Sequence, residues 1–305
     1  MTIYNSQGKT MQEIVDTKPQ MGITTGITQL DETILGLRPA HLVMVGAYSG
    51  IGKSSLMADL SLAAATQVPV CAFSLEMGEE LFIQRMWYNH ADLNYHTGMT
   101  GKLSPKEQKK LAKAMDTVSD INDIYVDATS GSMYPSWILK SKEPPIDSLE
   151  NAIRDYHKKG CRLFLIDYIQ YVNFGFKTES ETLRLKSLTG HLHKLTIELN
   201  VPIVAFAQLK KEVGDSSRKS DNHRPTLSDI RDSGYIINDS DVILLLHRPS
   251  YFENVDAVSL FSNKVESDAE IIVAKNRSGP MGVVPAIFHC HSMSWKDRDN
   301  DEGLI

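Results

Sequence analysis

The feature that most constrains this chain is a glycine loop set between an apolar run and a helical pattern. The apolar run covers residues 41–46, the loop covers residues 47–54, and the helical pattern covers residues 55–65. A strand, a glycine loop, Gly-Lys-Ser and a helix, in this order, are typical of a phosphate-binding P-loop. The glycines let backbone N–H groups turn toward a phosphate, and the helix adds its positive N-terminal end. We therefore predict a phosphate site formed by Ser49, Gly50, Ile51, Gly52, Lys53, Ser54 and Ser55.

Two side chains of this loop have chemical roles of their own. Lys53 can place a charge on the terminal phosphates, and the Ser54 hydroxyl is a suitable Mg²⁺ ligand. One position departs from the general pattern, because the first glycine would fall on Ala47 while Gly46 stands one residue too early. The alternative is a chance glycine loop before a helix, but the flanking strand and helix favour a P-loop.

Composition limits the classes of protein to which this chain can belong. The chain has 305 residues, 42% hydrophobic and 23% charged, which suits one large α/β core or two small ones. A formal net charge of −6 argues against a broad basic surface for duplex DNA. Cys71, Cys161 and Cys290 are far apart and odd in number, so we expect reduced thiols in a cytoplasmic protein. No apolar run approaches the roughly 18 residues of a membrane span, and no signal peptide is apparent.

Apolar runs alternate with helical patterns along most of the sequence. We expect strands at 41–46, 69–74, 124–126, 162–167, 201–208, 242–246, 269–274 and 283–288, and helices at 10–17, 78–90, 104–118, 147–160 and 178–199. A further short helix should be capped by Thr28 and end at Gly36, and residues 129–147 and 209–225 should be loops. Continuous apolar strands between helices predict an α/β fold with a mostly parallel central sheet covered on both faces.

Polar residues follow three of these strands, where ligands of parallel sheets bind. Asp167 fits a metal-side carboxylate, and its alternative is a cap for the next element. Glu76 fits a general base, and its alternative is a carboxylate in the first turn of a helix. Gln208 could hydrogen-bond both water and phosphate.

Two clusters near the C-terminal end of the chain also carry ionisable groups. Lys275 and Arg277 should project to one face at a hairpin tip, with no carboxylate beside them, and could reach the phosphates of another subunit. The alternative is a solvated charged tip. His289-Cys290-His291 could suggest a metal site, but no second Cys or His pair with zinc spacing accompanies it, so we interpret it as structural.

Taken together, these motifs resemble the ATPase domain of DnaB-type replicative helicases, within the RecA-like superfamily of P-loop NTPases. The resemblance covers about residues 10–290 and extends to Ala47, which the family also carries. Besides the P-loop, it rests on these segments: Thr25-Gly26-Ile27, Phe73-Ser74-Leu75-Glu76-Met77, Leu165-Ile166-Asp167-Tyr168-Ile169-Gln170, Val201-Pro202-Ile203-Val204 with Gln208, Ser228-Asp229-Ile230-Arg231-Asp232-Ser233-Gly234, and Lys275-Asn276-Arg277-Ser278-Gly279-Pro280.

The resemblance implies roles for particular residues. It implies ATP and Mg²⁺ as ligands, with Lys53 on phosphate and with Ser54 and Asp167 on the metal. It implies that Glu76 is the base, that Gln208 senses the γ-phosphate, and that Arg85 lies near the nucleotide. Lys275 and Arg277 resemble a finger pair that acts on the adjacent subunit. The DNA-binding loop would comprise Arg231, Asp232, Ser233 and Gly234, which grip single-strand phosphates partly through backbone N–H groups.

The resemblance also implies an assembly. Residues 25–305 would form the RecA-like helicase ATPase domain, and residues 1–24 an arm with a linker helix that packs on the adjacent subunit. The family's N-terminal helical domain has no counterpart here, as in a minimal, phage-like form. We expect a homo-oligomeric ring, a hexamer, that moves on single-stranded DNA and unwinds duplex DNA in the 5′ to 3′ direction. A helicase loader, a primase or another replisome protein would be a further partner. The protein would be located in the cytoplasm of a bacterium or of a phage-infected host.

Two other readings stay open at the level of sequence. One is a DNA-dependent ATPase similar to RecA and RadA recombinases or to KaiC, against which the 228–234 and 275–280 segments speak. The other is a regulator that binds a host replicative helicase and disturbs its ring.

Overall fold

The structure is a computed structural model, and it describes residues 21–128, 145–172, 181–210, 223–230, 233–252 and 266–298. The predicted helix at 10–17 and nearly all of the predicted loops at 129–147 and 209–225 lie outside these ranges. Within the ranges, no helix is long and apolar enough to cross a membrane.

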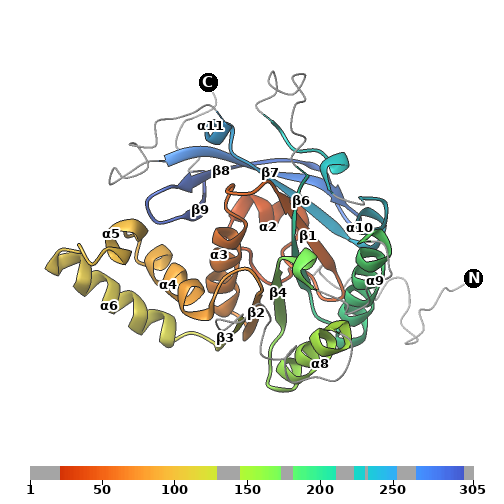
Figure 1. The fold of residues 1–305 in the computed structure, drawn as a ribbon, viewed down its shortest axis with the longest axis horizontal. Helices are drawn as coiled ribbons and strands as arrows, with labels where there is room; N and C mark the ends of the chain where they lie inside the picture. Colours follow the sequence, from red (N-terminus) through yellow and green to blue (C-terminus); the bar gives the residue numbers. More distant parts are fainter. Residues whose placement is uncertain are drawn as a thin grey trace, which may run out of the picture.

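A nine-stranded sheet forms the centre of the described part of the protein, with the order β3-β2-β4-β5-β1-β6-β7-β8-β9 (Figure 1). Its strands are β1 (Leu42–Ala47), β2 (Val70–Ser74), β3 (Ile124–Ala128), β4 (Leu163–Asp167), β5 (Ile203–Gln208), β6 (Val242–His247), β7 (Glu266–Asn276), β8 (Gly282–His289) and β9 (Ser294–Asp297). Strands β1 to β6 are paired in parallel, whereas β7, β8 and β9 are added antiparallel. The expected mostly parallel sheet is confirmed.

Helices lie on both sides of the sheet (Figure 1). They are α2 (Thr28–Ile34), α3 (Lys53–Ala65), α4 (Glu79–His90), α5 (Tyr95–Met99), α6 (Pro105–Ser119), α8 (Pro145–Lys158), α9 (Glu181–Leu199), α10 (Ser233–Asp239) and α11 (Pro249–Phe252). Helix α3 contacts β1, β2 and β4, while α9 contacts β1 and β5. Burial on both faces explains why the parallel strands read as unbroken apolar runs instead of alternating ones.

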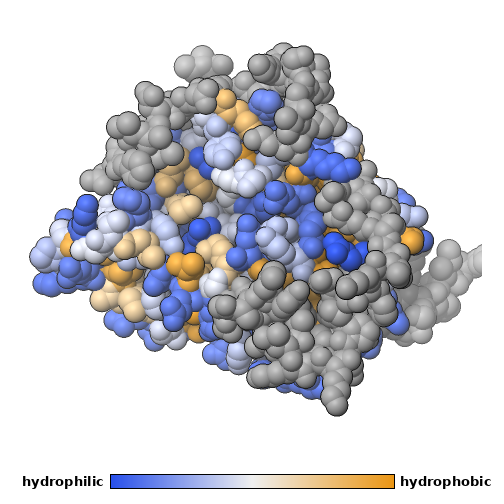
Figure 2. All heavy atoms as spheres, viewed as in Figure 1, coloured by the Kyte–Doolittle hydropathy of each residue, from blue (hydrophilic) through white to orange (hydrophobic). Residues whose placement is uncertain are grey.

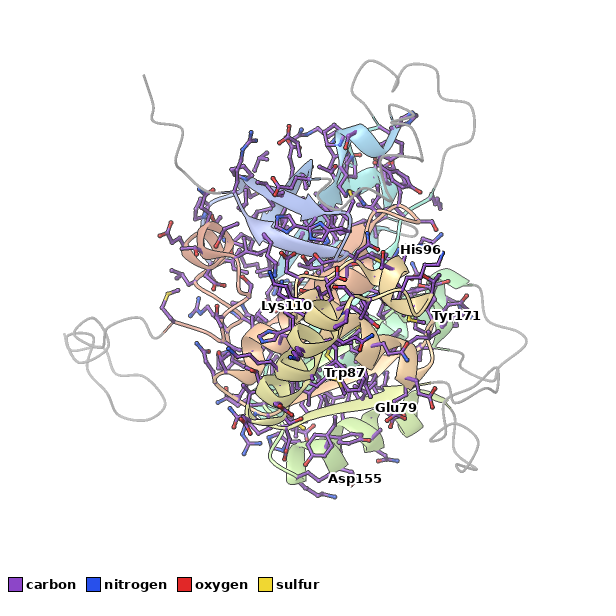
Figure 3. All side chains as sticks on the ribbon, turned by 90° about the vertical axis from the view of Figure 1, so that its left-hand side faces the viewer. Glu79, Trp87, His96, Lys110, Asp155 and Tyr171 are labelled. Carbon is purple, nitrogen blue, oxygen red and sulfur yellow. The ribbon has the colours of Figure 1, made fainter. Side chains whose placement is uncertain are left out.

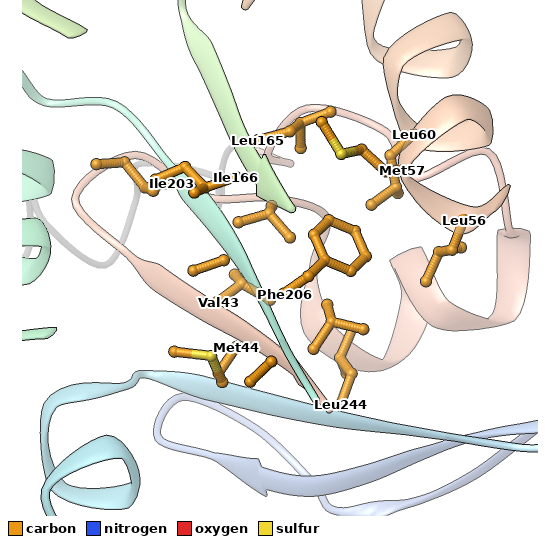
Figure 4. Packing of buried hydrophobic residues seen from close by; sticks show 14 of the residues in the cluster. Val43, Met44, Leu56, Met57, Leu60, Leu165, Ile166, Ile203, Phe206 and Leu244 are labelled. Atoms are coloured by element: carbon orange, nitrogen blue, oxygen red, sulfur yellow. The ribbon is translucent and has the colours of Figure 1, made fainter. Parts of the chain in front are cut away.

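The main core extends over both faces of the sheet, and Figure 4 shows the part between the sheet and α3. Phe206 of β5 and Leu165 of β4 are fully buried there, beside Leu56 and Met57 of α3. Helices α4, α5 and α6 form a further layer (Figure 3), which has a small core of Tyr88, Ala91, Leu93 and Ala114. On the face shown in Figure 2, hydrophobic residues are scattered among hydrophilic ones.

Several predictions about the ends of helices can be compared directly with the structure. Helix α6 starts as predicted, because Ser104 accepts a hydrogen bond from the Glu107 backbone and Glu107 accepts one in return from the Ser104 backbone. The predicted Thr28 cap is wrong. Its backbone N–H instead donates to the Asp297 carboxylate at 2.8 Å, and the backbone turns left-handed already at Leu35, one residue before Gly36. Strand β9, which supplies Asp297, was not predicted.

Candidate functional site

The P-loop follows β1 as predicted, and its glycines adopt conformations that other residues rarely take. Gly50 has φ 81° and Gly52 has φ 114°. A Cβ atom on Gly50 would collide with the Tyr251 hydroxyl, and one on Gly52 would lie 2.9 Å from a Phe288 ring carbon. The loop therefore requires glycine for both backbone shape and space. Helix α3 starts at Lys53, so its positive end lies at the loop.

Ser54 and Asp167, the predicted metal pair, meet directly. The Ser54 hydroxyl donates a hydrogen bond to Asp167 Oδ2 at 2.5 Å. Burial raises the pKa of Asp167 to about 6, against the opposing effects of the Ser54 hydrogen bond and the Lys53 charge. Its other oxygen, Oδ1, is buried and has no hydrogen-bond partner among the described residues. A carboxylate oxygen without a partner, next to a hydroxyl, is a donor set that fits a hard divalent cation such as Mg²⁺.

Two predicted cations lie close to this pair, Lys53 buried and Arg85 half-buried. Lys53 is 6% exposed, and burial lowers its pKa against the opposing charges of Asp167 and Glu76. Burial also lowers the pKa of Arg85, whose guanidinium lies 5.8 Å from the centre of the Tyr95 ring. The Arg85 Nε atom is buried without a hydrogen-bond partner in the part of the chain that the structure describes. Cations withdrawn from water in this way favour a polyanionic ligand, which would restore the interactions lost with water.

A single pocket of about 500 Å³ brings most of the predicted residues together. It is lined by Ser49, Gly50, Gly52, Lys53, Ser54, Ser55, Glu76 and Arg85. Ile51 is fully buried in the core instead of lining the pocket. Asp167 lies beneath Ser54, and Glu76 is exposed at the end of β2. The volume is within the range of small-ligand and cofactor sites.

Gln208 lies at the base of the P-loop without lining this pocket. It ends β5, where it is in register with Ala47 of β1. Its backbone N–H and C=O both bond the Gln170 side-chain amide, at 3.3 and 3.1 Å. The structure thus places Gln208 on the strand next to the loop, at the carboxyl edge of the sheet.

The opposite wall of the pocket comes from residues that sequence reasoning missed. They are Arg248, Tyr251, Phe288, Cys290 and Met293. The Arg248 guanidinium lies 3.8 Å from the centre of the Phe288 ring and donates to the Ile51 carbonyl at 3.3 Å. Arg248 directly follows β6, so its strand-end position was a usable signal. The others depend on α11 and the β8–β9 hairpin, for which the sequence carried no such signal.

The predicted finger pair, at the end of β7, packs against the C-terminal end of helix α10. Lys275 Nζ donates to the Ile237 carbonyl and to the Ser240 carbonyl, the latter at 2.7 Å. Arg277 pairs with Asp241 at 3.1 Å and donates to the Asn238 carbonyl at 2.5 Å. The expectation of a tip without a neighbouring carboxylate is therefore wrong, because Asp241 follows α10 and faces Arg277.

The predicted DNA-binding loop is only partly visible. Gly234 lies in the first turn of α10, which begins at Ser233. Arg231 and Asp232 lie outside the described residues. The three cysteines are free, with Cys71 and Cys161 buried and Cys290 partly exposed, as expected of reduced thiols.

A mostly parallel α/β sheet with a P-loop after β1, whose serine meets a carboxylate at the end of β4, defines a P-loop nucleotide-binding protein of the RecA-like class. The family model for the DnaB-like helicase C-terminal domain matches residues 22–297, and the chain belongs to that family.

Relatives and solved structures agree with this placement. The chain is 33% identical over 270 residues to the replicative DNA helicase DnaB of Geobacillus stearothermophilus, and 31% identical over 270 residues to the replicative DNA helicase DnaC of Bacillus subtilis. Each alignment covers 88% of this chain but 54% of the relative, so the chain spans about half the length of these relatives.

Two solved structures share its fold at 24% identity and cover 94% of this chain. One is an ATPase domain, with a TM-score of 0.77 and 95% of that chain covered. The other is a DnaB-like replicative helicase studied for its interactions with primase, with a TM-score of 0.78 and 65% of that chain covered.

Proposed function

We propose that this protein is an ATP-dependent replicative DNA helicase, a ring-forming translocase on single-stranded DNA that unwinds duplex DNA. The observation that carries the proposal is the pocket in which Lys53, the Ser54–Asp167 pair and Glu76 converge on a P-loop. Membership of the DnaB-like family and replicative helicases among its relatives support the same function.

The pocket suits ATP with Mg²⁺. Lys53 and the loop N–H groups would hold the phosphates, and Ser54 with Asp167 would hold the metal, which neutralises charge on the phosphates when bound. Glu76, an exposed residue of the pocket lining, would accept a proton from an attacking water. The wall of Arg248, Tyr251 and Phe288 offers aromatic and cationic surface for a base.

Assembly and partners are part of the proposal. We propose a hexameric ring in which Lys275 and Arg277 of one subunit act on the nucleotide of the next, and in which loop 231–234 grips single-stranded DNA. Six copies of a small loop let a protein of net charge −6 hold a polyanion without a broad basic surface. A loader or a primase is a further partner by family resemblance, the polarity is 5′ to 3′, and the location is the cytoplasm of a bacterium or an infected host.

The test measures ATPase rate with and without single-stranded DNA, on protein whose mass is followed by light scattering. We expect DNA to stimulate hydrolysis and the mass to approach six protomers. Glu76→Gln should lower the rate by about 10²-fold or more while nucleotide binding persists. A stable monomer without DNA stimulation would contradict the proposal. Capture of a host helicase, without intrinsic hydrolysis, would instead favour a regulator.

A further inference from the structure

Three side chains from distant parts of the chain converge behind the nucleotide pocket. Asp92 lies in the turn between α4 and α5, His289 ends β8, and His291 lies in the β8–β9 turn. One donor atom from each lies within 4.8 Å of the others. His291 Nε2 is 2.7 Å from Asp92 Oδ1, and His289 Nδ1 is 3.7 Å from the same oxygen. We propose that these residues bind a transition-metal ion of the Zn²⁺ class.

The donor set is the first argument. Two imidazole nitrogens, which are ligands of borderline softness, select Zn²⁺ and its neighbours over Mg²⁺ or Ca²⁺, and Zn²⁺ also accepts a carboxylate oxygen. Bonds of about 2.0–2.1 Å in a tetrahedron place donor atoms about 3.4 Å apart. The distances from Asp92 Oδ1 to His291 Nε2 and to His289 Nδ1, 2.7 and 3.7 Å, lie below and above that value. Three protein ligands would leave one position for water, as in zinc sites that stay open.

The surroundings of the histidines are the second argument. His289 Nε2 lies 3.5 Å from Glu266 Oε1, so Nδ1 is the nitrogen that faces Asp92. A histidine ligand commonly offers its second ring nitrogen to a carboxylate in this way. His291 is 7% exposed, and its Nδ1 is buried without a hydrogen-bond partner in the described ranges. His289 is thus the histidine whose second ring nitrogen already has a supporting carboxylate among the described residues.

Backbone contacts hold the three residues in place. The Tyr95 N–H donates to the His291 carbonyl at 2.8 Å and so ties α5 to the hairpin turn. Lys110 Nζ of α6 donates to the Asp92 carbonyl at 3.2 Å, and Figure 3 labels Lys110. The ligands therefore come from two bodies, the α4–α6 layer and the β8–β9 hairpin, that a metal would join.

The site is separate from the nucleotide pocket, although it shares the hairpin. Cys290, between the two histidines, lines the pocket and lies 3.4 Å from an Arg248 nitrogen. A metal on His289 and His291 would fix the strand end that presents Phe288 and Cys290 to a nucleotide. The sequence alone favoured a structural role for His289-Cys290-His291, because Asp92, almost 200 positions earlier, is not part of any local metal motif.

The test is direct metal binding to the full chain, without nucleotide or Mg²⁺. Chelator-treated protein is titrated with Co²⁺, and visible absorption reports histidine-ligated, low-coordinate cobalt. Equilibrium dialysis with Zn²⁺ gives stoichiometry and affinity. We expect one ion per chain and a rise in Tm on addition of Zn²⁺.

Matched variants assign the site. His289→Gln combined with His291→Gln should abolish the Co²⁺ bands, and Asp92→Asn alone should weaken Zn²⁺ binding by at least tenfold. Asp167→Asn, which alters the nucleotide-site carboxylate, should leave the bands unchanged. Circular dichroism checks that each variant is folded. Absence of bands in the unmodified chain, or bands that persist in the folded double-histidine variant, would overturn the proposal.

Discussion

At the scale of single residues, the P-loop backbone is held by hydrogen bonds from side chains that lie far away in sequence. Trp295 Nε1 donates to the Gly52 carbonyl at 3.0 Å, and Arg248 donates to the Ile51 carbonyl at 3.3 Å. These bonds occupy outward-facing carbonyls of a loop whose Gly52 has φ 114°. They therefore stabilise the backbone conformation in which the loop binds phosphate.

Trp295→Phe tests this contact, because it removes the indole N–H and keeps an aromatic ring against Phe288. A neutral hydrogen bond contributes about 1 kcal/mol, so we expect the Kd for ATP to rise about fivefold. Calorimetric titration with a non-hydrolysable ATP analogue measures the change. Trp87→Phe, on α4, is the matched control and should leave the Kd unchanged. An equal Kd for Trp295→Phe and the unmodified protein would rule out the proposed support.

Asp59 of α3 is a buried acid whose burial has a consequence for pH dependence. Its oxygens accept hydrogen bonds from the Asn89 side chain and from the Trp295 backbone N–H. Burial raises its pKa from 3.8 to about 6. Because the folded pKa is the higher one, the folded state binds more protons between these values. The stability contribution of this group is therefore present below pH 4 and is lost as pH rises through 6.

We expect this loss to amount to about 1 kcal/mol between pH 5 and pH 7, from the linkage between proton binding and folding. The measurement is urea unfolding at both pH values for the unmodified chain and for Asp59→Asn, which cannot titrate. The unmodified chain should lose stability relative to the variant as pH rises. A difference between the two proteins that stays constant with pH would show that Asp59 does not titrate in this range.

At the scale of elements, helix α10 is capped by the two proposed finger residues. Lys275 and Arg277 of the β7–β8 region donate to carbonyls at its C-terminal end, where cations are favoured. The same helix begins at the proposed DNA-binding loop. An Arg277 side chain that leaves Asn238 and Asp241 for a neighbour's phosphate would therefore release one end of the helix whose other end adjoins that loop.

Arg277→Ala tests whether Arg277 acts in hydrolysis on the adjacent subunit without contributing to nucleotide binding in its own subunit. We expect it to abolish ATPase activity while the Kd for nucleotide stays within about twofold, because Arg277 is absent from its own subunit's pocket. Steady-state hydrolysis and nucleotide titration measure the two quantities. Arg298→Ala, a surface arginine 3.5 Å from Asp268, is the control and should retain full activity. Full ATPase in Arg277→Ala would exclude the trans-finger role.

At the scale of the whole molecule, the two halves of the sheet divide the work. The parallel half provides the P-loop, Glu76, Asp167 and, directly after β6, Arg248, whereas the antiparallel half provides Phe288 of the pocket lining and the proposed finger pair. Residues 1–24 are proposed to pack on the adjacent subunit, which would make ring closure depend on a segment outside the nucleotide-binding body.

Deletion of residues 1–20 tests whether this arm is required for ring closure. We expect the shortened chain to keep its fold and nucleotide Kd but to lose the hexameric mass and DNA-stimulated hydrolysis. Light scattering and ATPase assays on the same samples give the result. A deleted chain that still forms hexamers would show that the arm is not required for the ring.

Local sequence was sufficient for the parallel half of the fold and for most of the predicted pocket. Each parallel strand is an apolar run, since both its faces are buried, and the predicted pocket residues other than Arg85 of α4 stand after a strand or in the glycine loop. Helix α6 was recognisable because Ser104 and Glu107, only three residues apart, form its cap. These features depend on neighbours in the chain, so the sequence displays them.

Only the tertiary structure decided the rest. Trp295 meets Gly52 across 243 positions, Asp297 meets Thr28 across 269, and His291 meets Asp92 across 199. Strand β9, the aromatic wall of the pocket and the pairing of Arg277 with Asp241 depend on such contacts as well. The sequence by itself determined the α/β class, the P-loop and the strand-end carboxylates, because short-range geometry and burial leave a periodic pattern, and the RecA-like class followed from the resemblance of its motifs to a known family. It could not determine what packs behind the P-loop, because contacts between distant residues leave no such pattern in either partner.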